Sequence, residues 1–137
     1  HSLVQIQIMW LLINPNWATY ITLPEYWPLQ SDYACLADLA DMLKSSPTSM
    51  STAHVLELMR ESIHANTINQ LMRHVSQYME GFANPSPEDE QGFQDGMQRL
   101  LKELKAQQIQ DLVLKNSTVG LSNDENRLLV ALISDRP

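Results

Sequence analysis

Apolar residues recur along this 137-residue chain every three or four positions, which is the periodicity of an amphipathic α-helix. The pattern predicts a first helix from Ser2 to Ile13, ended by Asn14-Pro15, and a short helix from Pro15 to Ile21. Strand-like alternation of β-branched residues is nearly absent, and only four glycines occur. The periodicity therefore predicts an all-α fold.

Three further helices are predicted in the first eighty residues. The segment 31–44 places its apolar residues on one stripe, and the loop before it carries Tyr26 and Trp27, which we expect to fold back onto the core. Thr52 is expected to cap the next helix, and the segment 65–80 forms the one after it. These helices together predict a bundle.

The stretch "GFANPSPEDE", residues 81–90, is the clearest interruption of the pattern. Ser86 is expected to cap a new helix with Pro87 in its first position, and Glu88–Glu90 lie in the first turn, where the helix dipole favours acidic groups. The helical pattern then continues to about Lys115, a length of roughly 40 Å. Part of such a helix should extend beyond a small bundle.

The end of the chain predicts a helical hairpin. Gly120 is expected to end the long helix, and Ser122 with Glu125 matches the capping box that begins a last helix. Because the connection is short, the two helices should pair antiparallel.

The polar segment "KAQQ" marks where the long helix leaves one packed body and enters another. The sequence therefore predicts a helical bundle subdomain over residues 1–104, followed by a long helix and a C-terminal helical hairpin subdomain over residues 105–137.

The last helix carries an unbroken apolar run from Leu128 to Ile133. A hairpin partner can cover only one face of it, and exposed apolar surface usually marks a protein interaction site. The alternative is that the helix buries itself entirely, which a predecessor of thirty residues makes geometrically awkward.

Composition limits the class of function. Hydrophobic residues make up 44% and charged residues 18%, which is typical of a globular domain. The formal charge of −7 argues against direct nucleic-acid binding.

The apolar run Leu3–Ile13 is too short to cross a membrane and has no basic segment before it, so neither a membrane span nor a signal peptide is expected. A lone Cys35, expected to be buried, fits the cytoplasm, and the missing initiator Met suggests a domain excised from a longer protein.

Catalytic machinery is not evident. His54, His64 and His74 are ten residues apart, which is not the spacing of helical zinc ligands, so surface or half-buried helix histidines are expected. Nucleophile elbows, phosphate loops and CxxC motifs do not occur in the sequence. We therefore expect neither an enzyme nor a metal or other cofactor.

Two motifs carry a family resemblance. They are "LLINPNWATYI", residues 11–21, and "GLSNDEN", residues 120–126, and their order and separation of about 105 residues matter more than either motif alone. With them the sequence resembles the C-terminal helicase-binding domain of bacterial DnaG-type primase across its whole length.

The resemblance implies that the hairpin docks on the N-terminal domains of the replicative helicase. The primase's zinc-binding and RNA-polymerising domains would lie upstream, so this chain should synthesise no primers itself. The leucines and the isoleucine would supply apolar area and the charged residues would set register, with these residues expected at the contact: Arg127, Leu128, Leu129, Leu132, Ile133, Asp135 and Arg136.

A second partner follows from the same resemblance. The family's bundle receives the acidic C-terminal tail of single-stranded-DNA-binding protein at a groove involving the first helix. The candidate residues here are Gln5, Ile8 and Leu12. Gln5 departs from the family's pattern, since some relatives have an arginine there.

Two alternatives stay open at this stage. One is a stand-alone helical scaffold or self-assembly domain whose hairpin pairs with itself, which light scattering would reveal as a concentration-dependent dimer. The other is an N-terminal domain of the helicase, which shares the bundle character but would not predict "GLSNDEN" before the last helix.

Overall fold

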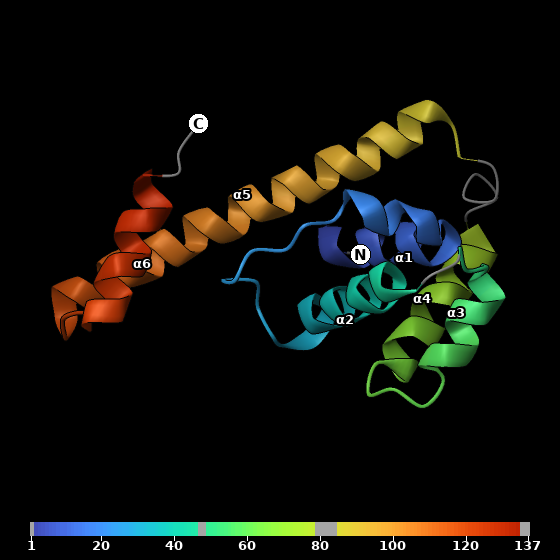
Figure 1. Cartoon of the computed structure of the whole chain (residues 1–137), viewed down its shortest axis with the longest axis horizontal. Helices are drawn as coiled ribbons and strands as arrows, with labels where there is room; N and C mark the ends of the chain where they lie inside the picture. The colour runs from blue at the N-terminus through green and yellow to red at the C-terminus, as the bar shows by residue number, and fades with distance from the viewer. Residues whose placement is uncertain (1, 47–48, 79–84, 135–137) are drawn as a thin grey trace. The chain divides into compact units, whose positions relative to one another are not determined.

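The computed structural model describes residues 2–46, 49–78 and 85–134. Within these ranges every regular element is helical and no strand occurs, which confirms the all-α prediction. The elements are shown in Figure 1: α1 (Leu3–Ile13), the 3₁₀ helix η1 (Pro15–Tyr20), α2 (Ser31–Ser45), α3 (Thr52–Met59), α4 (Ala65–Tyr78), α5 (Pro87–Thr118) and α6 (Asn123–Ser134).

The chain divides into two compact units, His1–Gln98 and Arg99–Pro137, which we call the bundle unit and the hairpin unit. The division falls inside α5, so this helix contributes residues to both. The sequence places the boundary at residue 104/105, whereas the units meet at 98/99. The "KAQQ" segment, 105–108, lies inside the hairpin unit and does not interrupt the helix.

Helix α1 forms the centre of the bundle unit, where it contacts η1, α2, α3 and α4 (Figure 1). It can do so because it is apolar on nearly every side, and Ile8, Leu11 and Leu12 are each 0% exposed. Ser2 caps its first turn, because the Ser2 hydroxyl accepts a hydrogen bond from the Gln5 amide and the Gln5 side chain accepts one from the Ser2 amide.

Aromatic side chains close the bundle core around η1. The ring centroid of Trp17 lies 5.6 Å from that of Trp10 and 5.3 Å from that of Phe93 on α5. Trp27 folds back as predicted, with its indole nitrogen donating a hydrogen bond to the Tyr33 carbonyl oxygen at 2.8 Å. Tyr26 is half-buried.

The helix caps follow the sequence with one exception. Ser86 and Asp89 form a reciprocal capping box, with hydrogen bonds of 2.9 and 3.1 Å, at the start of α5 as expected. The cap of α3 was assigned to the wrong residue, because Ser51 accepts the hydrogen bond from the His54 amide. Thr52 is instead the first helical residue, and its hydroxyl donates to the Leu12 carbonyl oxygen at 2.8 Å.

A hydrogen bond from a buried carboxamide side chain joins α1 to α5. Gln7 is 2% exposed, and its side-chain nitrogen donates a hydrogen bond of 2.7 Å to the Phe93 carbonyl oxygen. Gly96, on the next turn of α5, leaves the necessary space, since a β-carbon there would lie 2.8 Å from the Gln7 side-chain oxygen. The two helices therefore approach closely only because residue 96 has no side chain.

Two titratable side chains are buried in the described part of the bundle unit. Cys35 is 1% exposed as predicted, and burial raises the pKa of its thiol to about 12. His64 differs from the prediction of a surface or half-buried helix residue, because it is 7% exposed and immediately precedes α4. Its Nε2 lies 2.6 Å from Asp38 Oδ2 on α2, and this polar partner makes its burial tolerable.

Candidate partner-binding surface

The hairpin unit is built on a tightly specified turn. Gly120 adopts a φ of +82°, and its amide donates to the Lys115 carbonyl oxygen at 3.0 Å, which ends α5 as predicted. The capping box also forms as predicted, because the Ser122 hydroxyl and the Glu125 carboxylate each accept the other residue's amide at 3.1 Å.

An ion pair joins the two helices beside this turn. Lys115 Nζ lies 2.7 Å from Glu125 Oε2. This hydrogen bond to Lys115, followed by those from Ser122, lowers the pKa of the Glu125 carboxyl. The pair therefore contributes stability above the ordinary pKa of glutamate, and the contribution is lost as pH falls through the lowered value.

One face of α6 is covered. Leu132 on α6 is 4% exposed, and Leu112 on α5 is 7% exposed. Leu128 and Leu129, one turn before Leu132, are half-buried. Leu132 was expected at the partner contact, but it packs inside the fold and, at 4% exposure, can contribute little apolar area there.

The opposite face of α6 is accessible. Val130 is 64% exposed and Ile133 is 42% exposed, and we call these two residues the α6 ridge. Val130 lies about 200° around the helix from Leu132 and so points away from the covered side. Arg127 is also exposed. Of the remaining predicted contact residues, Asp135 and Arg136 lie outside the described residues.

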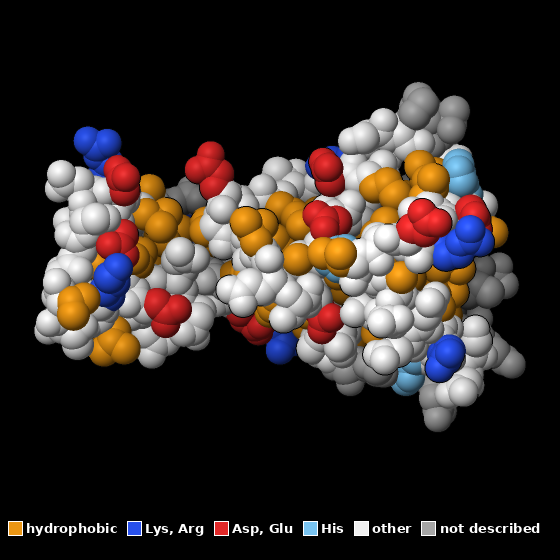
Figure 2. Space-filling model, turned by 90° about the horizontal axis from the view of Figure 1, so that it is seen from below, with side chains coloured by type: hydrophobic (Ala, Val, Ile, Leu, Met, Phe, Trp, Pro, Cys, Tyr) orange, Lys and Arg blue, Asp and Glu red, His pale blue; other side chains and the backbone are white. Residues whose placement is uncertain are grey.

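Three further large apolar side chains are exposed in the described part of the hairpin unit. Val113 and Leu114 at the end of α5 are 52% and 64% exposed, and Val119 in the turn is 78% exposed. Figure 2 shows hydrophobic side chains reaching the surface at the end of this unit, where α5 turns into α6. We call these three residues the hairpin tip. The sequence pattern did not indicate them, because residues 112–114 are apolar one after another and have no helical period that would mark an exposed face.

A family model described as "DNA primase DnaG DnaB-binding" matches residues 4–132 of the chain. The chain belongs to this family.

Curated relatives agree with the family assignment. The chain is 47% identical over 135 residues to the DNA primase of Neisseria meningitidis serogroup A, and 45% identical over 133 residues to that of serogroup B. Each match covers 97% of the chain but only 22% of the relative. The chain thus spans about a fifth of the length of these primases.

A solved structure supports the fold. The C-terminal domain of DnaG primase from Vibrio cholerae superposes with a TM-score of 0.75, covering 98% of both chains at 22% sequence identity. At that identity the likeness concerns the fold alone.

The candidate site for an acidic tail peptide is largely closed. Ile8 and Leu12 are both 0% exposed in the bundle core, so neither can line a surface groove. They were misplaced because α1 is apolar around its whole circumference and its sequence does not reveal an outer face. Gln5 is half-buried, and its side-chain nitrogen donates to Asp32 Oδ2 at 3.0 Å.

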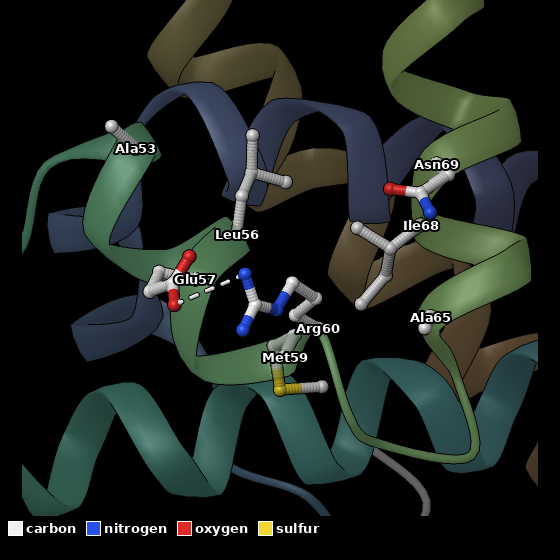
Figure 3. Close-up of a pocket in the computed structure, with 8 residues that line it drawn as sticks. All are labelled: Ala53, Leu56, Glu57, Met59, Arg60, Ala65, Ile68 and Asn69. Carbon is white, nitrogen blue, oxygen red and sulfur yellow. Dashed lines mark ion pairs between the residues drawn. The ribbon is translucent and has the colours of Figure 1, made fainter.

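A groove of about 400 Å³ lies between α3 and α4, and none of the predicted site residues lines it. Figure 3 shows the Arg60 guanidinium lying across it, between Glu57 and the Ile68 side chain, with Met59 below. Arg60 pairs with Glu57 at 3.6 Å, and both side chains are more than half exposed. Such a pair contributes little to stability.

In the part of the chain that the structure describes, His, Cys, Asp and Glu side chains do not gather in any group of three or more that could hold a metal ion. Nor does any described helix combine the length and apolar character that a membrane span requires.

Proposed function

We propose that this chain is a non-catalytic cytoplasmic domain that attaches DNA primase to the replicative helicase DnaB and so couples primer synthesis to the replication fork. Membership of a family named for DnaB binding supports the partner. The observation that carries the choice of surface is the α6 ridge, two accessible apolar residues that lie about 200° (Val130) and about 100° (Ile133) around α6 from buried Leu132.

The proposed mechanism is the insertion of a helix into a groove of the helicase's N-terminal domains. Val130 and Ile133 supply the central apolar contact, while half-buried Leu129, about 40° around the helix from Ile133, supplies its edge. Arg127 lies at the rim, where a charge affects the association rate and its salt dependence more than the affinity.

Replacing both ridge residues, Val130→Asp with Ile133→Asp, should weaken helicase binding by roughly 100-fold or more. Two aliphatic contacts are lost, and two carboxylates would be buried without partners. Isothermal titration of purified helicase with the wild-type and variant domains measures the effect, and circular dichroism should show unchanged helix content, because both side chains are exposed in the domain alone.

Ile63→Asp provides the matched control. Ile63 is 92% exposed but belongs to the bundle unit, so this variant should bind the helicase like the wild type. Normal affinity of the ridge variant would reject the proposed surface. A wild-type domain that dimerises in light scattering and does not bind the helicase would instead favour the self-assembly alternative.

The tail of single-stranded-DNA-binding protein should not bind saturably at the Gln5 position. An acidic peptide arriving there meets the Asp32 carboxylate, which already accepts the Gln5 hydrogen bond, and the two apolar candidates are enclosed. Fluorescence anisotropy of a labelled tail peptide tests this expectation. Saturable binding that disappears in Gln5→Ala would contradict it.

A further inference from the structure

We propose that the groove between α3 and α4 is a self-association surface, which α3 of a second copy of this chain occupies. The contact is two-fold, so α3 of each copy lies in the groove of the other. The groove belongs to the bundle unit, whereas the proposed helicase contact belongs to the hairpin unit. The two contacts can therefore be tested independently.

The distribution of charge in the bundle unit favours this face for a contact between identical chains. The unit contains eleven acidic and three basic residues, a formal charge of −8. The α3–α4 segment, residues 51–78, contains two acidic and two basic residues and is formally neutral. The rest of the unit therefore accounts for the whole charge of −8. Two copies repel one another where their acidic surfaces approach, but the α3–α4 segments can meet without a net charge penalty.

The groove presents one continuous face of α3. Ala53, Leu56, Glu57 and Arg60 all line it and lie on a stripe about 100° wide (Figure 3). Three apolar residues from the two helices complete the lining: Met59, Ala65 and Ile68. Because two of the lining residues are alanines, a second helix can approach closely. In a two-fold contact each α3 then packs this stripe into the groove that the other copy's stripe lines.

An exposed ion pair makes the surface self-complementary. Arg60 Nη1 lies 3.6 Å from Glu57 Oε1 in the same chain, and the two side chains are 68% and 64% exposed. When α3 meets its copy antiparallel across a two-fold axis, Glu57 of each chain lies opposite Arg60 of the other. The internal pair contributes little to stability, so exchanging it for two pairs between the copies costs little.

The size of the surface predicts a weak dimer. Helix α4 has 14 residues and is about 21 Å long, and two adjacent helices are about 20 Å wide, so the footprint is on the order of 400 Å² per copy. A stable interface buries about 800 Å² per partner, and smaller ones are transient. We therefore expect a dissociation constant on the order of 100 µM. Such a contact operates between copies that a common partner holds close together.

Sedimentation equilibrium at domain concentrations up to about 1 mM should show a monomer–dimer equilibrium. Glu57→Arg and Arg60→Glu should each lower the association constant by about 10-fold or more, because each substitution places like charges opposite one another at two points. Leu58→Ser is the matched control on α3. Leu58 is 49% exposed but lies about 200° around the helix from both Leu56 and Arg60, so this variant should dimerise like the wild type.

A mixture of the two charge variants tests the contact between copies directly. At positions 57 and 60, the Glu57→Arg chain carries two arginines and the Arg60→Glu chain carries two glutamates. An equal mixture should therefore form a heterodimer at least as tight as the wild-type dimer. A change within a single chain cannot produce this recovery. Unchanged thermal melting by circular dichroism shows that both variants are folded.

A wild-type domain that stays monomeric at about 1 mM overturns the proposed self-association, and so does a mixture that associates no better than either variant alone. If Leu114→Ser in the hairpin tip abolishes a dimer that both charge variants keep, the contact lies in the hairpin unit and the α3–α4 surface is wrong. None of these measurements involves the helicase. Titration of the helicase with the ridge variant therefore tests the proposed function separately.

Discussion

Replacing Gly96 with alanine should destabilise the bundle unit by about 1–3 kcal/mol, although alanine is favoured over glycine inside a helix by about 1 kcal/mol. The new β-carbon would lie 2.8 Å from the buried Gln7 carboxamide. Gln7 cannot move aside without losing its hydrogen bond to the Phe93 carbonyl oxygen. Urea denaturation followed by tryptophan fluorescence measures the loss, since all three tryptophans lie in this unit.

Gly92 supplies the control on the same helix. A β-carbon there would have nothing within 4 Å, so Gly92→Ala should stabilise the unit by about 0.5–1 kcal/mol. Combining Gln7→Ala with Gly96→Ala should restore part of the loss, because the shorter side chain leaves room for the methyl group. Equal effects of the two glycine substitutions would contradict the close approach of α1 and α5.

The second large effect is expected at Leu132. Leu132→Ala should cost about 2–5 kcal/mol, because it empties a buried site. The large buried side chains described in the hairpin unit are only Leu100, Leu112 and Leu132, so α6 should separate from α5 and helicase affinity should fall with it. Far-UV circular dichroism should show lost helix, while tryptophan fluorescence stays as in the wild type.

Val130→Ala in the α6 ridge is the control for Leu132→Ala. Val130→Ala removes an exposed side chain from the same helix, so it should leave helix content unchanged. If Leu132→Ala also kept its full helix content and weakened only helicase binding, Leu132 would be a contact residue after all, as the sequence suggested.

The helix ends were predictable because their signals are local. Gly120 with the Ser122–Glu125 box, and Ser86 before Pro87, each depend on residues within a few positions of one another. Thr52 shows the limit of such reasoning. Ser51 and Thr52 are both good caps, and the choice between them was decided by the Leu12 carbonyl oxygen, forty positions away.

The proposed binding surface was harder to predict for a physical reason. The run 128–133 is apolar at every position, so it has no helical period that distinguishes a covered face from an exposed one. The tertiary packing, and not the local pattern, determines that Leu132 is buried and Val130 is accessible. Gln7 and His64 are similar cases, because their polar partners, Phe93 and Asp38, come from distant parts of the chain.

The buried thiol of Cys35 has a practical consequence for labelling this domain with a fluorophore. With a pKa of about 12, Cys35 is ionised in roughly one molecule in 100,000 at neutral pH, and maleimide reagents attack only the thiolate. A fluorophore can therefore be placed on a cysteine introduced at an exposed position such as Asn116 while the native thiol is left in place. Association with purified helicase, the proposed partner, could then be timed on single molecules of otherwise unaltered sequence.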